Sequence, residues 1–284
     1  QNAPMSVFRF KYFNVVNERS AMKVNTDGVL LGAAMTILPA DRRLLDIGTG
    51  TGTIALMVAQ RALGIPGQAG DDETKAGDDE KVAGDDETKA RGDEKVAGDD
   101  EMGAGGDFMI DAIDIDEPSA SEAAANFGES HWAEHLRAHN LSLQYFADSE
   151  PCKYDLIFSN PPYFEDSCIA PDERKSTARH TSVGLSYRDI FEFASERLAE
   201  NGRVSLVLPA DQEAALCRYA RMCGLHLFRI VRIRTVERKA PIRIITEFSR
   251  QRCQTPAEEM LTIMNEGKYT QEYLSLTKDF YLFA

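Results

Sequence analysis

The stretch LLDIGTGTGTIAL, residues 44–56, decides the fold of this 284-residue chain. A short apolar run that contains Asp46 leads into Gly48, Gly50 and Gly52, and a helix-forming segment follows. Glycines between a strand and a helix let the backbone turn tightly and approach a ligand closely. The GxGxG spacing differs from the GxGxxG of dinucleotide sites, and an acid here suits a ligand with an ammonium group better than a pyrophosphate. The stretch predicts a strand, a ligand-binding turn and a helix; a turn that binds nothing is the alternative.

Strand-like and helix-like segments alternate along the chain. The strand-like segments are 43–48, 108–115, 141–146, 153–159, 202–209, 226–236 and 242–250. The segments with helical spacing are 53–63, 117–139, 186–200 and 211–224. Strands joined by crossover helices form a parallel sheet covered on both faces, and a short connection makes the last two strands antiparallel. We expect an α/β, Rossmann-like fold: a mostly parallel seven-stranded sheet with an antiparallel edge hairpin and helices on both faces.

Residues 66–107 differ in composition from the rest of the chain. Five seven-residue units, from GDDETKA at 70–76 to GDDEMGA at 98–104, hold 14 Asp and Glu against 5 Lys and Arg, which is −9 of the chain's −14. A coiled coil needs two apolar positions in each heptad, and these units lack them. Because so polar a segment cannot bury enough surface to fold, we expect a disordered acidic insertion in a single domain that spans 5–284.

Positive charge gathers near the C-terminal end, over residues 218–252. Ten cations stand there against Glu237 and Glu247, a surplus of +8. The cations are Arg218, Arg221, Arg229, Arg232, Arg234, Arg238, Lys239, Arg243, Arg250 and Arg252. Such a surplus suits phosphate binding, and a solvated strand face is an equal alternative.

Other features narrow the class of protein. No run of 18 apolar residues occurs, so the sequence predicts no transmembrane helix. The five cysteines form no CxxC pair, which favours a cytoplasmic chain over a secreted, disulfide-built one. His131, His135 and His139 have the spacing of a metal-binding helix face. No carboxylate stands where a metalloprotease needs its base, so we expect no metal site.

Three acids follow the expected second and third strands. Asp114 ends the segment 108–115, where a carboxylate can accept both hydroxyls of a ribose. Asp116 is placed either to reach the same area or to cap the following helix. Asp148 follows the segment 141–146 and could accept a hydrogen bond from the exocyclic amine of an adenine.

The stretch KYDLIFSNPPYFEDS, residues 153–167, leaves a strand through Asn160, Pro161, Pro162 and Tyr163. The prolines fix the backbone and remove two donors, so Asn160 is held rigidly and can accept from an amine. The carbonyl of Pro161 adds a second acceptor, and two acceptors on one NH2 group draw its lone pair out of conjugation. Tyr163 offers a face on which a flipped base can stack. A plain turn is the alternative.

The combination of DIGTGTG with NPPY resembles the class I S-adenosylmethionine-dependent amino-methyltransferases. The stretches AMKVNTDGVLLGA (21–33) and FYLFA (280–284) narrow the resemblance to the bacterial valine-tRNA adenine-37 N6-methyltransferases. It covers nearly the whole chain except the 70–107 insertion. It implies S-adenosyl-L-methionine as the cofactor and a tRNA as the substrate, and we expect Arg218 to Arg252 to contact that tRNA. We expect no membrane and no obligate protein partner.

The resemblance also implies roles for the motif residues. Asn160, Pro161, Pro162 and Tyr163 match the catalytic loop. The residues that match the cofactor site are Lys23, Thr26, Asp27, Asp46, Gly48, Gly50, Gly52, Asp114 and Asp148. Among them Asp114 matches the ribose acid and Asp148 the adenine-side acid, while the three N-terminal residues lie against the cofactor pocket.

We therefore expect an enzyme that transfers a methyl group from S-adenosylmethionine to N6 of an adenine in tRNA, adenine 37 of the valine tRNA by resemblance. One alternative is a glutamine N5-methyltransferase of release factors, but that group usually has a helical N-terminal domain, and only about forty residues precede Asp46. The other is an inactive RNA-binding protein with this fold, against which the intact set of Asp46, Asp114 and Asn160 argues.

Overall fold

The computed structural model describes residues 6–66, 108–149, 152–162 and 184–282. The acidic heptapeptide repeats and Tyr163 lie outside the described residues. Within the described part, no helix is both long enough and apolar enough to cross a membrane.

Nine strands form one sheet in the order β11-β10-β8-β9-β7-β6-β3-β4-β5. They are β3 (Arg43–Ile47), β4 (Met109–Asp114), β5 (Leu136–Asn140), β6 (Tyr154–Ser159), β7 (Leu198–Pro209), β8 (His226–Val236), β9 (Arg243–Ser249), β10 (Ala257–Asn265) and β11 (Lys268–Tyr269). Only β9 and the short β11 run antiparallel to their neighbours. A separate hairpin pairs β1 (Val7–Arg9) with β2 (Asn14–Val16).

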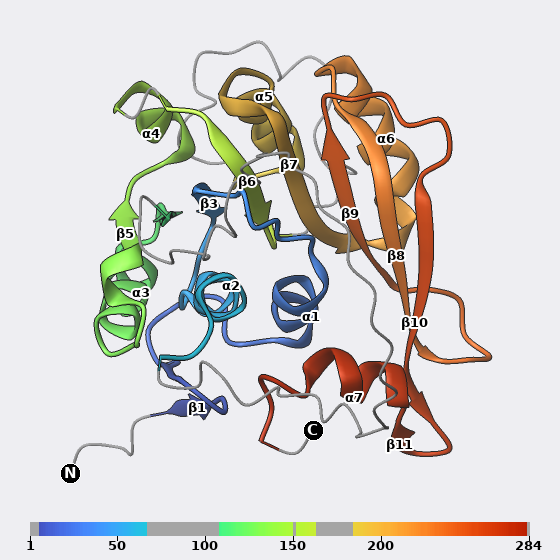
Figure 1. The fold of residues 1–284 in the computed structure, drawn as a ribbon, viewed down its shortest axis with the longest axis horizontal. Helices are drawn as coiled ribbons and strands as arrows, with labels where there is room; N and C mark the ends of the chain where they lie inside the picture. The colour runs from blue at the N-terminus through green and yellow to red at the C-terminus, as the bar shows by residue number, and fades with distance from the viewer. Residues whose placement is uncertain (1–5, 67–107, 150–151, 163–183, 283–284) are drawn as a thin grey trace, which may run out of the picture.

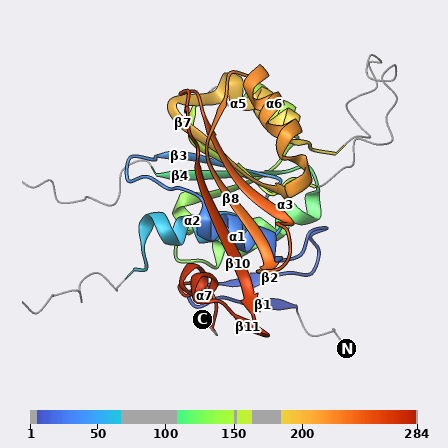
Figure 2. The same cartoon turned by 90° about the vertical axis from the view of Figure 1, so that its right-hand side faces the viewer.

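Helices cover both faces of the sheet (Figure 1). They are α1 (Thr26–Ala34), α2 (Thr53–Leu63), α3 (Glu117–Gly128), α4 (Leu143–Ser149), α5 (Tyr187–Arg197), α6 (Glu213–Met222) and α7 (Gln271–Thr277). Figure 2 shows β3 and β4 between α5 on one side and α1 and α2 on the other.

Two hydrophobic clusters lie on the two faces, because alternate residues of each strand point to opposite sides. In β3, Leu44 joins the cluster with α1 and α2, whereas Leu45 joins the cluster with α5 and α6. In β6, Leu156 and Ile157 divide in the same way, and all four side chains are fully buried. A central strand buried on both faces explains why these segments read as continuous apolar runs.

The expected α/β fold with a mostly parallel sheet is confirmed, but the count of seven strands is wrong. The expected antiparallel edge hairpin is present, but β10 and β11 form it. The pair predicted for that place, β8 and β9, is antiparallel but lies inside the sheet, between β10 and β7. The β10 sequence AEEMLTIMN has apolar residues in its second half that do not alternate along the strand, and only Leu261 is buried, so the segment gives a weak strand signal.

The boundaries around residues 117–149 also differ from those expected. The helix predicted for 117–139 ends at Gly128, and its last part forms β5, while the strand predicted for 141–146 forms most of α4. Leu143 and Phe146 are buried. Their spacing of three residues places them on one helix face, whereas the alternation of apolar and polar residues in the segment is equally compatible with a strand. The expected spacing of His131, His135 and His139 on one helix face is therefore wrong as well.

Candidate cofactor and amine-binding site

The glycine turn between β3 and α2 has the backbone that its sequence predicts. Gly48, Gly50 and Gly52 have φ angles of 72°, 57° and 80°, the left-handed region that other residues rarely adopt. A Cβ on Gly52 would lie 2.4 Å from Cε1 of Phe127 on α3. The turn therefore requires glycine both for its conformation and for the close approach of α3.

Asp46 is fully buried at the carboxyl end of β3. Its Oδ2 accepts a hydrogen bond from Thr49 Oγ1 at 2.7 Å, and its Oδ1 has no hydrogen-bond partner among the described residues. Burial, and to a smaller extent the charge of Asp114, raises the pKa of Asp46 to about 7, although the Thr49 hydrogen bond opposes the shift. A buried carboxylate with an open acceptor is suited to the ammonium group of a ligand.

Asp114 ends β4 next to this turn. Its Oδ2 accepts from the Gly50 N–H and its Oδ1 from the Asp116 N–H, both at 2.9 Å. Burial raises its pKa, although these two hydrogen bonds oppose the shift. Ile115, the next residue, is 73% exposed, an apolar side chain held in solvent beside the acid. Asp116 caps α3 by accepting from the Ser119 N–H at 3.0 Å. Of the two roles expected for Asp116, the structure therefore shows the helix cap.

Asp148 is exposed near the end of α4, and no hydrogen bond or ion pair joins it to Asp46 or Asp114 among the described residues. The segment before Asp148 forms the helix α4 instead of the expected strand. The residue that ends β5 is Asn140, whose Nδ2 donates to the carbonyl oxygens of Asp114 and Ile115, both at 3.1 Å. Asn140 was missed because its strand was taken for the end of a helix.

Asn160 follows β6 and is only 6% exposed. The preceding Ser159 donates from Oγ to the carbonyl oxygen of Ile47 at 2.6 Å, so Asn160 and Gly48 leave neighbouring strands at the same level, about 5 Å apart by the usual strand spacing. Asn160 Nδ2 lies 3.6 Å from Met22 Sδ and 3.5 Å from Asn25 Oδ1. This arrangement turns the amide nitrogen toward the N-terminal segment.

Met22 and Asn25 provide these contacts, and they border Lys23, Thr26 and Asp27, the residues that the resemblance places against the cofactor pocket. Asn25 is the N-cap of α1 and accepts from the Gly28 N–H at 2.9 Å. The Lys23 ammonium donates to the Glu18 carbonyl oxygen at 2.5 Å. Thr26 is exposed at the first position of α1, and Asp27 pairs with Arg243 at the start of β9, at 2.8 Å.

Half of the ten cations in the basic stretch contact acids, a hydroxyl or carbonyl groups of the protein itself: Arg229, Arg232, Arg234, Arg243 and Arg250. Arg229 pairs with Glu247 at 2.5 Å and with Glu259 at 2.7 Å. Arg232 pairs with Glu213 and Glu258. Arg250 donates to main-chain carbonyl oxygens, among them that of Ser195 at 2.8 Å.

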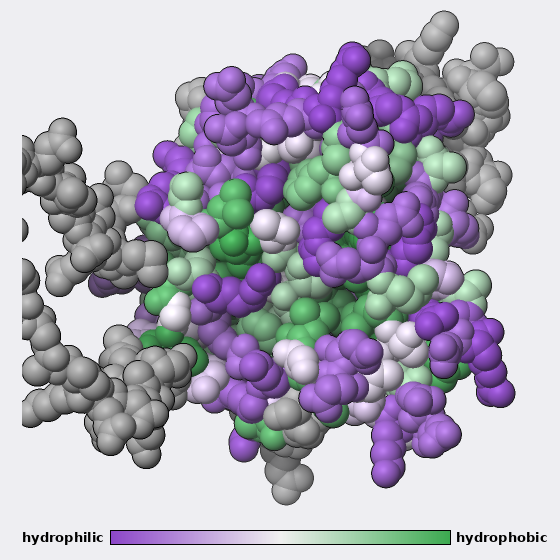
Figure 3. Space-filling view, turned by 45° about the vertical axis from the view of Figure 1, so that its right-hand side comes forward, coloured by the Kyte–Doolittle hydropathy of each residue, from purple (hydrophilic) through white to green (hydrophobic). Residues whose placement is uncertain are grey.

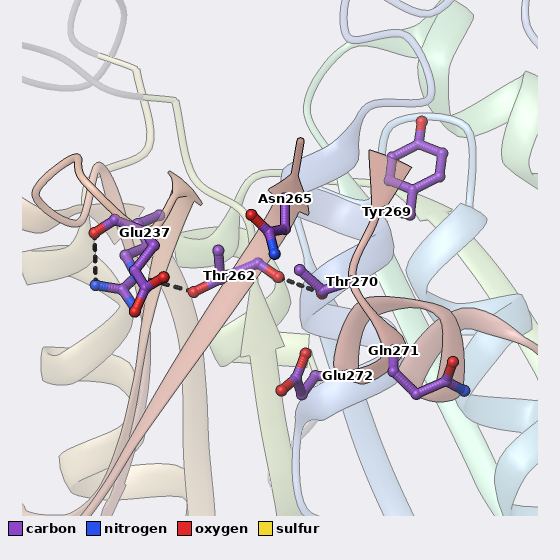
Figure 4. A pocket seen from close by; sticks show the side chains of 8 residues that line it. Glu237, Thr262, Asn265, Tyr269, Thr270, Gln271 and Glu272 are labelled. Atoms are coloured by element: carbon purple, nitrogen blue, oxygen red, sulfur yellow. Dashed lines mark hydrogen bonds between the residues drawn. The ribbon is translucent and has the colours of Figure 1, made fainter. Parts of the chain in front are cut away.

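A polar pocket of about 450 Å³ opens where β8 and β10 end (Figure 4). Its lining residues are Arg234, Glu237, Thr262, Asn265, Tyr269, Thr270, Gln271 and Glu272. Arg234 donates from Nε to Thr262 Oγ1 and from Nη1 to the Glu237 carbonyl oxygen, each at 2.8 Å. None of the predicted site residues lines this pocket, and its one guanidinium stands against two carboxylates.

The sheet is Rossmann-like, and it places the buried carboxylate of Asp46 and the amide of Asn160 at the ends of the adjacent strands β3 and β6. This arrangement is that of the class I S-adenosylmethionine-dependent methyltransferases. Solved structures have the same fold. A predicted O-methyltransferase from Agrobacterium tumefaciens superposes with a TM-score of 0.56 at 14% identity, over 89% of this chain and 96% of that one. A putative class I methyltransferase from Listeria monocytogenes gives 0.50 at 12% identity, over 90% and 72%.

The chain belongs to the family of the tRNA1(Val) (adenine(37)-N6)-methyltransferases. It is 34% identical over 276 residues to the member from Parabacteroides distasonis, covering 97% of both chains. It is 34% identical to the member from Yersinia pseudotuberculosis, over 97% of this chain and 92% of the relative. No family model matches the chain. The protein is an S-adenosylmethionine-dependent methyltransferase of this family, as the resemblance predicted.

Proposed function

We propose that the protein transfers a methyl group from S-adenosylmethionine to N6 of an adenine in tRNA, adenine 37 of the valine tRNA. The observation that carries this proposal is the position of Asn160, which leaves β6 beside the glycine turn with its amide nitrogen turned toward Met22 and Asn25. The name shared by the relatives supports the choice of tRNA and of the adenine. The cytoplasm, where tRNA is modified, is the proposed location.

The residues of the glycine turn fit S-adenosylmethionine, which supplies an electrophilic methyl group when bound. The open Oδ1 of Asp46 would receive the ammonium group of the cofactor. Asp114 stands at the end of β4, where a carboxylate binds ribose hydroxyls, and the exposed Ile115 offers an apolar surface for adenine. Asn140 holds the backbone of both residues in place.

Asn160 would orient the substrate amine. Its Nδ2 is directed toward Asn25 and Met22, so Oδ1 is the end of the amide that would accept from the adenine N6 amine. The buried Pro161 follows, and its carbonyl oxygen would be the second acceptor. When two acceptors fix the adenine N6 amine, its lone pair points toward the methyl group of S-adenosylmethionine. This alignment lowers the entropy cost of bringing the two reactants into the reacting orientation. We keep Tyr163 as the proposed stacking surface for the base.

Fewer cations of the basic stretch are proposed to contact tRNA than its net charge implies. Arg238 and Lys239 lie exposed in the turn between β8 and β9. This turn is at the same end of the sheet as Asn160, because β9 runs antiparallel to both β7 and β8, so that β8 and β6 point in the same direction. We propose these two for phosphate contacts. Figure 3, turned so that the side of Figure 1 with β8 and β10 comes forward, shows hydrophilic residues around a more hydrophobic middle.

The decisive experiment is mass spectrometry of nucleosides from tRNA incubated with the protein and S-adenosylmethionine. N6-methyladenosine in the valine tRNA, absent when the cofactor is omitted, is the expected result. Release-factor peptides that contain the target glutamine serve as a parallel substrate. Methylation of the peptide with unmodified tRNA would contradict the proposal and support the glutamine methyltransferase instead.

A further inference from the structure

One face of α3 holds three buried polar side chains that the proposed chemistry does not use. Ser119, Glu122 and Asn126 are 2%, 1% and 3% exposed. Their spacing of three and four residues places them on one face of the helix. Burying polar groups is costly unless they are hydrogen-bonded. The hydrogen bonds of these three side chains therefore show which segments this face of α3 keeps in place.

Glu122 accepts three hydrogen bonds from consecutive backbone N–H groups. Its Oε1 accepts from Glu18 at 2.7 Å and from Arg19 at 2.9 Å, and its Oε2 accepts from Ser20 at 2.9 Å. Burial by itself would raise the pKa of Glu122, but these donors outweigh it and hold the pKa below its ordinary value. The side chain is therefore an ionised anchor for the segment at neutral pH.

Asn126 joins the same segment to the glycine turn. Its Oδ1 accepts from the Val16 N–H at 2.8 Å. Its Nδ2 donates to the carbonyl oxygen of Val16 at 3.1 Å and to that of Thr51 at 2.9 Å. Ser119 Oγ lies 3.1 Å from Ser20 Oγ. One helix face thus contacts both residues 16–20 and the turn between Gly50 and Gly52.

The anchored segment continues across the site. Ser20 Oγ donates to the Met22 carbonyl oxygen at 3.0 Å. A Cβ on Gly50 would lie 3.4 Å from Ser20 Oγ and 3.6 Å from that carbonyl oxygen, while Met22 Sδ lies 3.6 Å from Asn160 Nδ2. Residues 20–22 therefore extend from the glycine turn to the amine acceptor.

Apolar packing contributes little to holding these residues, since Ala21, Met22 and Lys23 are exposed. We propose that Glu122, supported by Ser119 and Asn126, is a positioning residue that holds residues 16–22 against the cofactor site between the glycine turn and Asn160. This inference rests on the proposed placement of S-adenosylmethionine at the glycine turn, but it does not depend on which substrate is methylated.

Calorimetric titration with S-adenosylmethionine tests the proposal. Loss of three charge-assisted hydrogen bonds frees the segment, so Glu122→Ala should raise the Kd at least about tenfold. Glu122→Gln keeps one acceptor oxygen and should fall between this variant and the wild type. The matched control is Glu129→Ala, which removes an exposed carboxylate at the C-cap of α3 and should leave the Kd unchanged. A Kd for Glu122→Ala within about twofold of the wild type would overturn the proposal.

Hydrogen exchange measured by mass spectrometry on Glu122→Gln gives a second test, which holds even if the alanine variant fails to fold. We expect faster exchange confined to residues 16–22, with unchanged exchange in α5 and α6. Unchanged exchange over 16–22 would overturn the proposal. If cofactor binding depends on Glu122 while the wild type leaves tRNA unmethylated, the substrate assignment fails and the positioning role stands.

Discussion

The turn region at the ends of β3, β4 and β6 and the strand region of β8, β9 and β10 handle charge in opposite ways. In the turn region Asp46 is a buried acid and Asp114 a half-buried one. Both have raised pKa values, and neither forms an ion pair with a described residue. In the strand region Arg229 and Arg232 each contact two carboxylates.

The difference shows why the net charge of a segment is a poor guide to its partner. The +8 counted over residues 218–252 omits Glu213, Glu258 and Glu259, which lie outside that stretch in sequence but beside its arginines in space. Charge that the protein satisfies internally is not offered to a ligand. Polar groups that the fold buries without a partner are the stronger sign of a site.

The largest effect that would test this comparison is expected at Asn160. Asn160→Ala should lower methyl transfer by about 10²–10³-fold, because the amine loses a fixed acceptor in the transition state. The Kd for S-adenosylmethionine should stay within about twofold of the wild type, since the glycine turn and Asp114 are unchanged. Radiolabelled methyl incorporation and calorimetry measure the two effects. Wild-type turnover in this variant would remove Asn160 from the site.

The next effect concerns the protonation of Asp46. The pKa of about 7 lies above the ordinary 3.8, so its contribution to stability is present when the acid is protonated and is lost as the pH rises from about 4 through 7. A cationic ligand needs the ionised form. Affinity for S-adenosylmethionine should therefore increase between about pH 6 and pH 8, by up to tenfold per pH unit below the pKa.

Asp46→Asn is the variant that sharpens this test. It should bind S-adenosylmethionine about tenfold more weakly at pH 8 and lose the pH dependence. Without ligand it should melt above the wild type at pH 8, by about 2–4 °C per kcal/mol gained. Calorimetry and thermal unfolding at two pH values measure both. An unchanged pH dependence would show that another group binds the ammonium.

A smaller effect on tRNA binding should distinguish the exposed cations from those that contact other groups of the protein. Replacing Arg238 and Lys239 with Ala should weaken tRNA binding and flatten its salt dependence by about one unit per lost phosphate contact. The matched variant, Arg232→Ala with Arg234→Ala, should leave the salt slope unchanged and lower the melting temperature, because these side chains bind Glu213 and Thr262. The reverse pattern would mean that the internal ion pairs open to receive tRNA.

The smallest effect is expected from deletion of residues 70–104. Long surface insertions add little to the cost of loop closure, so folding and cofactor affinity should match the full chain. Removal of nine negative charges should leave tRNA affinity equal or improved. Circular dichroism and the same binding isotherms measure the outcome. Loss of folding would show that the repeats pack on the domain.

Much of the fold and part of the site could be predicted from sequence, because the decisive signals there are local. Glycines with positive φ, apolar runs that suit central strands, and prolines after a strand each limit the backbone within a few residues. The turn at Gly48, the acid Asp114 and the strand exit at Asn160 are all where the sequence places them.

Tertiary structure alone decided the features that depend on contacts between distant segments. The segments that form β5 and α4 fit helix and strand patterns about equally, so packing chose between them, and with that choice Asn140 rather than Asp148 came beside Asp114. The contacts of Glu122 with Glu18 and of Arg232 with Glu258 join residues far apart in the chain. Hydrogen bonds and ion pairs across such separations leave no local pattern, and only folding brings the two partners together.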